Sequence, residues 1–308
     1  MKHLFIINPA AGSRDRTARY TQQIETICRE KGLAYEIRVS SAPGDCTRIA
    51  REAAQTGQDY HIYSCGGDGT LNEVVAGVAG YDNVAITMFA GGSGNDFIKI
   101  FNETEPFRDL ERLLDCEEST FDLLKCNDDI SLNICSVGFD ARIAADVSRY
   151  KRLPLLSGFR AYAVSAAMNI MKGISEHYVI EIDGEQIDGK QTLMCACNGR
   201  YYGGGFNPVP EADLQDGKMD VLLVRGVSRL KVLKIIGKYK NGQYAKYPDL
   251  IRHFRTDRIK LIFDKPTSIN LDGEIRTATE ADISIAKEKL RFFYPKGLTF
   301  SAKEPVHM

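Results

Sequence analysis

The stretch YHIYSCGGDGTLNEVVAGVAG, residues 60–80, joins a strand pattern to a helix pattern through a run of glycines. Residues 60–65 form a short, mainly apolar run, and apolar positions recur at helical spacing from residue 70 onward. Between the two patterns, a backbone without Cβ atoms can approach a ligand closely, while the first N–H groups of the helix face that ligand. The stretch therefore predicts a phosphate-binding loop.

Asp68, the acid among the loop glycines, indicates which class of ligand the loop would bind. A carboxylate would repel bare phosphate, so we expect a divalent cation to lie between the two. Magnesium nucleotide is the ligand that this arrangement predicts. Taken alone, GGDG is equally typical of a plain turn in which Asp68 caps the helix, so the assignment depends on other loops.

Two further loops follow strand patterns in the same part of the chain. Strand patterns at 3–8, 35–40, 60–65 and 84–89 alternate with helix patterns at 16–31, 45–56 and 70–79. This βαβ alternation predicts a parallel sheet covered by helices, with its ligand-binding loops at one edge. NPAAG (8–12) and AGGSGNDF (90–97) follow the first and fourth strand patterns, so we expect both beside the GGDG loop. Three such loops at one edge favour a ligand site over plain turns.

The pattern of predicted elements changes after residue 122. Longer strand patterns dominate, with helix patterns interspersed at 140–150, 156–173 and 228–240. We predict a Rossmann-like three-layer α/β domain over residues 1–122. A mainly β, sandwich-like domain is predicted over 123–308, and its C-terminal segment is a candidate to return to the first domain.

Composition sets the general class. The 308 residues, 44% of them hydrophobic, suffice for two cores, and a formal charge of -1 gives no general attraction to nucleic acid. The eight cysteines form no CxxC pair, which indicates reduced, mostly buried thiols. The N-terminus lacks a secretory pattern, and Arg160 and Lys172 interrupt the most apolar window, 153–174. We therefore expect a cytoplasmic protein without a membrane-spanning helix and without a nucleic-acid partner.

Several familiar nucleotide-binding classes lack their motifs in this chain. There is no GxxxxGK[ST], so a Walker-type P-loop is excluded, and no GxGxxG follows the first strand pattern, which disfavours a dinucleotide dehydrogenase. Protein-kinase signatures are also missing.

The combination of motifs resembles one family. GGDGTLNEV, with NPAAG upstream and GSGNDF downstream, resembles the diacylglycerol kinase catalytic domain, in particular the soluble bacterial lipid kinases related to sphingosine, ceramide and NAD kinases. SVGFDA (136–141), the run 203–221 and LDGE (271–274) are similar to later signatures of that family. The resemblance implies an NAD kinase/diacylglycerol kinase-like fold. It also implies ATP- and Mg²⁺-dependent transfer of the γ-phosphate to a lipid hydroxyl, most simply diacylglycerol giving phosphatidic acid in phospholipid biosynthesis.

The same resemblance assigns roles to individual residues. The nucleotide-binding set is Asn8, Pro9, Ala10, Ala11, Gly12, Ser40, Gly66, Gly67, Asp68, Gly69, Thr70, Leu71, Asn72, Glu73 and Ser93. Asp68 and Asp96 would organise the catalytic Mg²⁺, while Asp272 or Glu274 would serve as general base, with Glu274 the first choice. Phosphoryl transfer needs phosphate-binding groups, metal-binding acids and a general base, because the protein chiefly positions the phosphates, neutralises charge and accepts the hydroxyl proton.

A second, structural Mg²⁺ is also implied by the resemblance. It maps to Asp216, with backbone oxygens near Asp213 and Lys218. The sequence there reads DLQDGK, so Gln215 stands where an acid is often found in the family. This departure weakens the implied ligand set.

A lipid substrate requires contact with a membrane. SRLKVLKIIGKYKNGQYAK, residues 228–246, combines basic residues with an apolar set of Leu230, Leu233, Ile235 and Ile236, as in peripheral amphipathic helices. We expect peripheral binding to the inner face of the membrane, with a homodimer as one state of assembly; a helix packed on the β domain is the equally weighted alternative. The rival functions are an NAD kinase-like enzyme and a non-catalytic nucleotide- or lipid-binding regulator.

Overall fold

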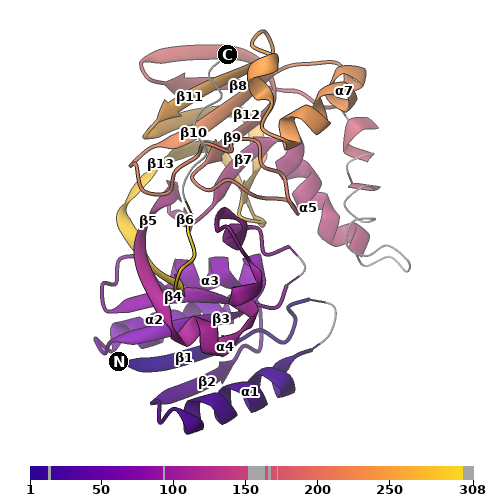
Figure 1. The fold of residues 1–308 in the computed structure, drawn as a ribbon. Helices are drawn as coiled ribbons and strands as arrows, with labels where there is room; N and C mark the ends of the chain where they lie inside the picture. The colour runs from indigo at the N-terminus through magenta and orange to yellow at the C-terminus, as the bar shows by residue number, and fades with distance from the viewer. Residues whose placement is uncertain (13–14, 93, 152–163, 166–167, 172, 301–308) are drawn as a thin grey trace. The chain divides into compact units, whose positions relative to one another are not determined.

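The computed structural model describes residues 1–308 except 13–14, 93, 152–163, 166–167, 172 and 301–308 (Figure 1). Contacts between residues divide the chain into two units. Unit 1 comprises Met1–Leu123, Gly203–Gly205 and Ala286–Ala302. Unit 2 comprises Leu124–Tyr202 and Phe206–Ile285.

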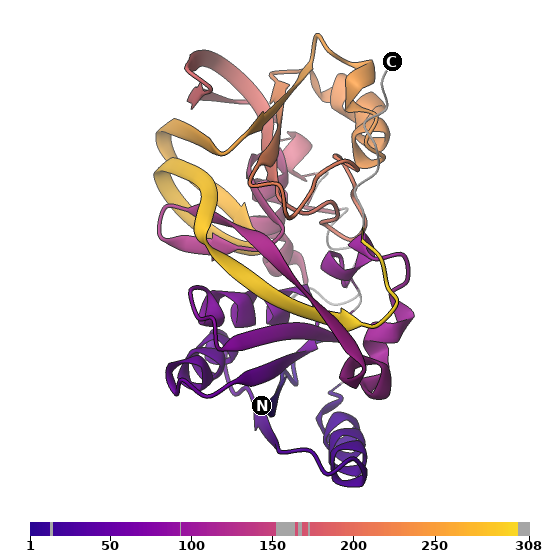
Figure 2. The same cartoon turned by 60° about the vertical axis from the view of Figure 1, so that its left-hand side comes forward.

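Unit 1 is a parallel sheet between helices. Its strands are β1 (Lys2–Ile7), β2 (Tyr35–Val39), β3 (Tyr60–Gly66) and β4 (Val84–Ala90), in the order β4-β3-β1-β2, and the end of β13 (Glu274–Pro295) pairs with β4. The main helices are α1 (Thr17–Glu30), α2 (Asp45–Gln55) and α3 (Asp68–Val78). Figures 1 and 2 show α1 on one face of the sheet and α2 with α3 on the other. The predicted three-layer α/β fold is confirmed.

The sequence patterns explain these layers. Every residue of β3 and of β4 is buried, as expected for parallel strands covered on both faces. Helix α2 buries one stripe at helical spacing, which consists of Cys46, Ile49, Ala50, Ala53 and Ala54. Shorter elements complete the unit: η1 (Phe97–Ile100), η2 (Glu105–Arg108), α4 (Leu110–Leu114) and part of β5 (Cys116–Cys126).

Unit 2 is built mainly from antiparallel strands. They are β6 (Asp129–Ser131), β7 (Ile134–Gly138), β8 (Glu176–Ile182), β9 (Glu185–Cys197), β10 (Met219–Arg225), β11 (Ile251–Thr256), β12 (Arg258–Leu271) and most of β13. Strands β9 and β12 each pair with both β7 and β8, so these four strands form a closed ring of pairs. The predicted β-rich second domain is confirmed.

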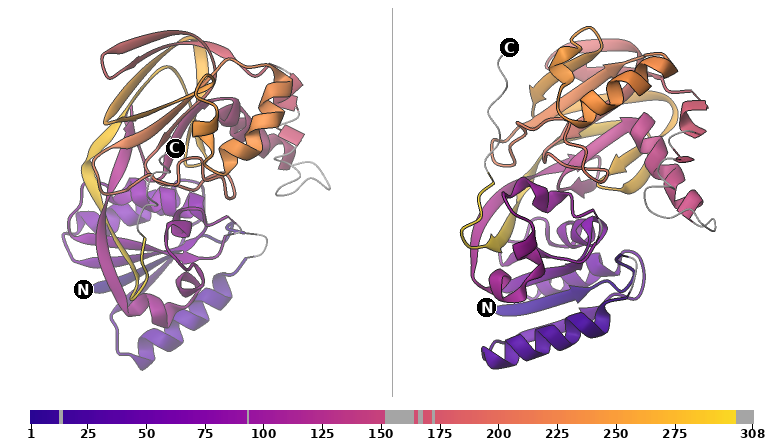
Figure 3. Two further views of the ribbon diagram at one scale, coloured as in Figure 1. Left: turned by 45° about the horizontal axis from the view of Figure 1, so that its top comes forward. Right: turned by 45° about the vertical axis from the view of Figure 1, so that its right-hand side comes forward.

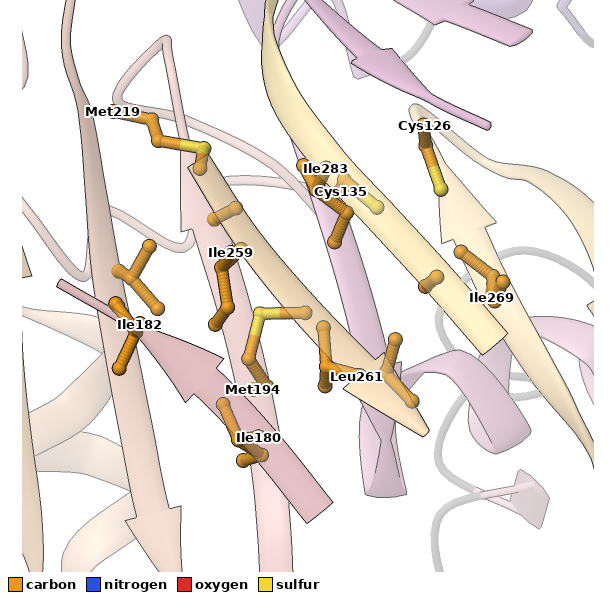
Figure 4. Close-up of a cluster of buried hydrophobic side chains, with 14 of the residues drawn as sticks. Cys126, Cys135, Ile180, Ile182, Met194, Met219, Ile259, Leu261, Ile269 and Ile283 are labelled. Atoms are coloured by element: carbon orange, nitrogen blue, oxygen red, sulfur yellow. The ribbon is translucent and has the colours of Figure 1, made fainter. Parts of the chain in front are cut away.

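The ring of strands encloses a hydrophobic core. Alternate residues of the strands point inward, among them Ile180, Met194, Leu261 and Ile269, which Figure 4 shows converging between the strands. Two-residue turns join β8 to β9 at Asp183-Gly184 and β12 to β13 at Asp272-Gly273, with positive φ at all four residues, as type I′ hairpins require.

Helices cover one side of unit 2. These are α5 (Phe139–Lys151) and α7 (Arg229–Lys240), on the same side of the strands in Figures 1 and 3, with η3 (Tyr244–Lys246) following α7. Much of the helix predicted at 156–173 lies outside the described residues. Among the described helices, none has the length and apolar character needed to cross a membrane.

The packing of α2 on α3 gives a test of the fold. A Cβ on Gly77 would lie 2.5 Å from the carbonyl oxygen of Thr47 and 2.8 Å from Cβ of Ala50. Overpacking of this kind costs about 1–3 kcal/mol, so Gly77→Ala should lower the free energy of unfolding by that amount in urea titrations. The matched control is Gly237→Ala on α7, where a Cβ would meet no atom within 4 Å. This second change should be neutral or stabilising by up to about 1 kcal/mol, and equal losses in the two variants would contradict the packing argument.

Candidate active site

Three glycine-containing loops meet at the carboxyl edge of the sheet in unit 1. The carbonyl oxygen of Gly66 accepts hydrogen bonds from the backbone nitrogens of Gly91 and Gly92, at 2.7 and 3.1 Å. A Cβ on Gly92 would lie 2.6 Å from Cα of Gly67, so the loop after β4 has no room for a side chain at this contact. The GGDG loop and the AGGSGNDF loop therefore pack backbone against backbone.

The NPAAG loop joins the same cluster. Asn8 Nδ2 donates to Thr70 Oγ1 at 3.1 Å, and a Cβ on Gly12 would lie 3.2 Å from the carbonyl oxygen of Gly91. Helix α3 begins at Asp68, directly after Gly67, so the first N–H groups of this helix lie among the three loops. The arrangement provides backbone donors and a helix dipole for an anionic ligand.

Two carboxylates flank the glycine at position 94. Asp68 Oδ1 accepts from the backbone nitrogens of Asp96 and Phe97, at 2.6 and 3.3 Å. A Cβ on Gly94 would lie 2.7 Å from Asp68 Oδ2 and 4.0 Å from Asp96 Oδ2. Asp96 is 6% exposed; its Oδ2 accepts from the backbone nitrogen of Gly204 at 2.7 Å, and its Oδ1 pairs with Lys99. The two acids predicted to act together do lie together.

This donor set fits a catalytic Mg²⁺. Magnesium is usually held by one or two carboxylates together with waters and substrate phosphates, so a dedicated cage of protein ligands is not required. Asp68 Oδ2 lies toward Gly94 and could supply one oxygen ligand, whereas both oxygens of Asp96 already have partners, so Asp96 could supply a second only by exchanging Lys99 or Gly204 for the ion. The described residues contain no group of three or more His, Cys, Asp or Glu residues placed to bind a metal, so any ion here would depend on the phosphates.

The residues implied for a structural Mg²⁺ fit less well. Asp216 Oδ2 already pairs with the guanidinium of Arg255, and Asp216 Oδ1 accepts from the backbone nitrogen of Lys218 at 2.8 Å. Asp213 Oδ1 accepts from the backbone nitrogen of Gln215 at 3.0 Å. An arginine therefore supplies the positive charge at Asp216, and we derive no role for a second metal.

The two acids of LDGE have different surroundings within unit 2. Asp272 Oδ2 accepts from Ser131 Oγ and from the backbone nitrogens of Leu132 and Asn133, at 2.7 to 3.0 Å, and its Oδ1 accepts from that of Ile134 at 2.8 Å. Both carboxylate oxygens thus hold the β12–β13 hairpin to residues 131–134, which join β6 to β7. The Glu274 side chain is 49% exposed, with Oε2 3.8 Å from Arg276. Of the two, Glu274 has the more accessible carboxylate.

Other predicted nucleotide-binding residues have structural contacts. Glu73 accepts from the backbone nitrogen of Cys46 at 3.1 Å and from Thr47 Oγ1 through its carbonyl oxygen, so it stabilises the start of α2. Leu71 and Asn72 are buried in unit 1, and Ser40 is buried at the end of β2. Ser93 lies outside the described residues.

Sequence reasoning missed two features. Lys99 pairs with Asp96 three residues earlier, a spacing that could have been noticed. Gly204 donates to Asp96 from a segment more than 100 residues away, and nothing local in the sequence signals that contact.

The α/β unit and the β-rich unit each match a family model. Residues 2–126 match the diacylglycerol kinase catalytic domain, and residues 133–294 match the YegS C-terminal NAD kinase beta sandwich-like domain. The chain therefore belongs to the lipid kinase family in which these two domains are combined.

Individual relatives agree with this assignment. A protein of Staphylococcus carnosus (strain TM300) with a provisional lipid kinase name is 28% identical over 280 residues, or 89% of each chain. A similar protein of Staphylococcus aureus (strain MRSA252) is 26% identical over 270 residues, covering 86% of this chain and 87% of its own. Two crystal structures from Bacillus anthracis str. Sterne, one described as a diacylglycerol kinase and the other provisionally so, superpose with TM-scores of 0.70 and 0.75. Each covers 97% of this chain and 98% of its own at 19% identity, which shows a shared fold.

The contrast between Asp272 and Glu274 can be measured as stability. Asp272→Asn would turn an amide N–H₂ toward a backbone donor, so it should lower the free energy of unfolding by about 1–3 kcal/mol. Glu274→Gln should change it by less than about 0.5 kcal/mol, because the side chain is exposed. Urea unfolding of both variants tests this difference. Equal stability of the two variants would show that the four contacts of Asp272 contribute little.

Proposed function

We propose that this protein transfers the γ-phosphate of ATP to the hydroxyl group of a lipid in a Mg²⁺-dependent reaction, with diacylglycerol as the first candidate acceptor and phosphatidic acid as the product. The observation that carries the proposal is the meeting of three glycine-containing loops with two carboxylates at one edge of the sheet. Membership of the lipid kinase family supports the class of acceptor.

The proposed chemistry is a single displacement. The acceptor oxygen forms a bond to the γ-phosphorus while the bond from that phosphorus to the β,γ-bridging oxygen breaks, and ADP leaves. Backbone N–H groups at the start of α3 would orient the phosphates, and Asp68 and Asp96 would hold Mg²⁺, which would supply neutralisation of phosphate charge. Lys99, which pairs with Asp96, would release this carboxylate when Asp96 binds the ion. Glu274 is the proposed acceptor of the hydroxyl proton, since both oxygens of Asp272 already accept hydrogen bonds.

A radiolabelled-ATP assay with extracted lipids, 1,2-dioctanoylglycerol and NAD tests this function. We expect label in a lipid product, none in NAD, and no turnover after chelation of Mg²⁺. Asp68→Asn, which keeps an oxygen for the backbone nitrogens of Asp96 and Phe97, should reduce turnover at least about 100-fold by weakening the metal site. Glu274→Gln should lower kcat with little change in the KM for ATP.

Asp128→Asn, at an exposed position beyond β5, is the matched control and should retain full turnover. Label in NAD instead of lipid would support the NAD kinase alternative. Absence of ATP consumption with every acceptor would favour a non-catalytic regulator and sink the kinase proposal.

We also propose that α7 contacts the membrane. The helix buries Val232, Ile235 and Tyr239 against unit 2, so Ile235, one of the four apolar residues of the predicted amphipathic pattern, is not available for this contact. Leu230 and Leu233 are instead 73% and 56% exposed on another side of the helix. Arg229 donates to the carbonyl oxygen of Met171, and the Met171 side chain is itself 69% exposed. Exposed large apolar side chains next to lysines are typical of a peripheral membrane site.

Vesicle sedimentation tests this contact. Replacing Lys231, Lys234 and Lys238 by Gln should weaken binding to vesicles that contain phosphatidylglycerol, because each lysine near an anionic surface contributes about 1 kcal/mol. The loss should be larger at low salt, since exposed charges are screened over about 10 Å at 0.1 M.

The control replaces three exposed lysines on other elements, Lys31, Lys125 and Lys287, by Gln. This variant has the same net charge as the α7 variant, so it isolates the position of the charges. Equal weakening in the two variants would show that α7 has no special part in membrane binding.

A further inference from the structure

The loop at residues 211–218, which leads into β10, is where the family resemblance implies a second divalent ion. Asp216 would be the only side-chain ligand of that ion. Its side chain is 18% exposed, so its carboxylate is mostly removed from water. A carboxylate in such a position requires positive charge or hydrogen-bond donors close by. The question is therefore which groups supply them in this chain.

Both oxygens of Asp216 have partners within the protein. Oδ1 accepts from the backbone nitrogen of Lys218 at 2.8 Å, and Oδ2 pairs with the guanidinium of Arg255. Arg255 lies on β11 directly opposite Asp220 of β10, so the pairing of these two strands fixes the position of its backbone. The hydrogen bond to Asp216 raises the pKa of Arg255, so the guanidinium keeps its charge throughout the neutral range.

A second ion pair holds the same loop to the end of β11. Lys218 Nζ lies 2.9 Å from Oδ2 of Asp257, which is the residue between β11 and β12. Two side chains of the loop, at positions 216 and 218, thus contact two side chains of one neighbouring segment, at positions 255 and 257. These contacts hold the loop in one conformation, which is the task of a structural ion.

The charges around the pair formed by Arg255 are already balanced. Asp213 and Asp220 also attract Arg255. Asp213 attracts the buried Arg200 as well, and Asp220 lies 2.6 Å from Nε2 of His253. The three carboxylates of this corner are therefore opposed by two guanidinium groups and a histidine. A divalent ion would leave an excess of positive charge here.

We infer that Arg255 is a built-in cation of this loop: its guanidinium takes the place of the second divalent ion, so the β-rich unit has no metal requirement. Unlike an ion, a guanidinium cannot be removed by chelation, and its planar donors match a carboxylate. The inference goes beyond the proposed function, since it concerns the stability of unit 2 and holds whether or not the protein transfers phosphate.

Metal titration of thermal unfolding tests the inference without ATP. All proteins in the test carry Asp68→Asn, so that an ion in unit 1 does not contribute. With Arg255 intact, Tm should be the same in EDTA, in excess MgCl₂ and in excess CaCl₂. Arg255→Ala should lower Tm in EDTA, because Asp216 loses its cation. Either metal should then raise Tm by about 3–6 °C at about ten times its Kd, since the freed carboxylate can bind the ion.

Two further variants locate the response. Adding Asp216→Asn to Arg255→Ala should abolish the gain from both metals. Arg258→Ala is the matched control, because Arg258 pairs with Asp282 in the same unit and is 64% exposed, against 59% for Arg255. Lys260 remains near Asp282 in this control, so we expect no response to either metal.

Either of two results would overturn the inference. The first is a saturable metal response with Arg255 intact that Asp216→Asn removes, which would show that the ion displaces the guanidinium. The second is the absence of any gained response in Arg255→Ala. If Arg255→Ala folds in neither condition, Arg255→Lys decides: it keeps the charge and should remain insensitive to both metals, and a gained response in this variant would refute the role of the charge.

Discussion

The backbone contact between Gly67 and Gly92 is the constraint on which the candidate active site depends. Gly66 accepts hydrogen bonds from the two glycines that follow β4, and the loops approach so closely that a Cβ on Gly92 would lie 2.6 Å from Cα of Gly67. Because the loops are held at this distance, Asp68 at the start of α3 can reach the backbone nitrogen of Asp96. A side chain at this contact would separate the loops and, with them, the two acids.

Asp68 and Asp272 have structural roles in addition to their proposed chemical roles. Asp68 ties the loop after β4 to α3 through Oδ1 and turns Oδ2 toward Gly94. Asp272 uses both oxygens for the hairpin, so loss of activity on its replacement would not by itself identify a proton acceptor. Neighbouring acids in one motif must therefore be compared by stability as well as by turnover. The exposed Glu274 is the acid for which the two measurements should diverge.

Regular patterns in the sequence predicted most of the fold. Alternation of short apolar strands with helical patterns located β1 to β4 and α1 to α3 within one or two residues, because covered parallel strands are apolar throughout. Asp183-Gly184 predicted the β8–β9 hairpin because both residues tolerate positive φ. The closure of β7, β8, β9 and β12 into a ring could not be predicted, since it depends on two strands that change partners along their length.

The same distinction between local sequence patterns and long-range packing applies to the candidate site. Three loops were predicted together because parallel topology forces strand ends to one edge, whereas the bond from Gly204 to Asp96 depends on long-range packing. Helix α7 shows most clearly what the spacing of apolar residues cannot predict. Its apolar residues occupy two sides, and only packing decides that Ile235 is buried while Leu230 and Leu233 are exposed. The same helix thus lines an apolar cavity with one side and presents leucines to the surroundings with another.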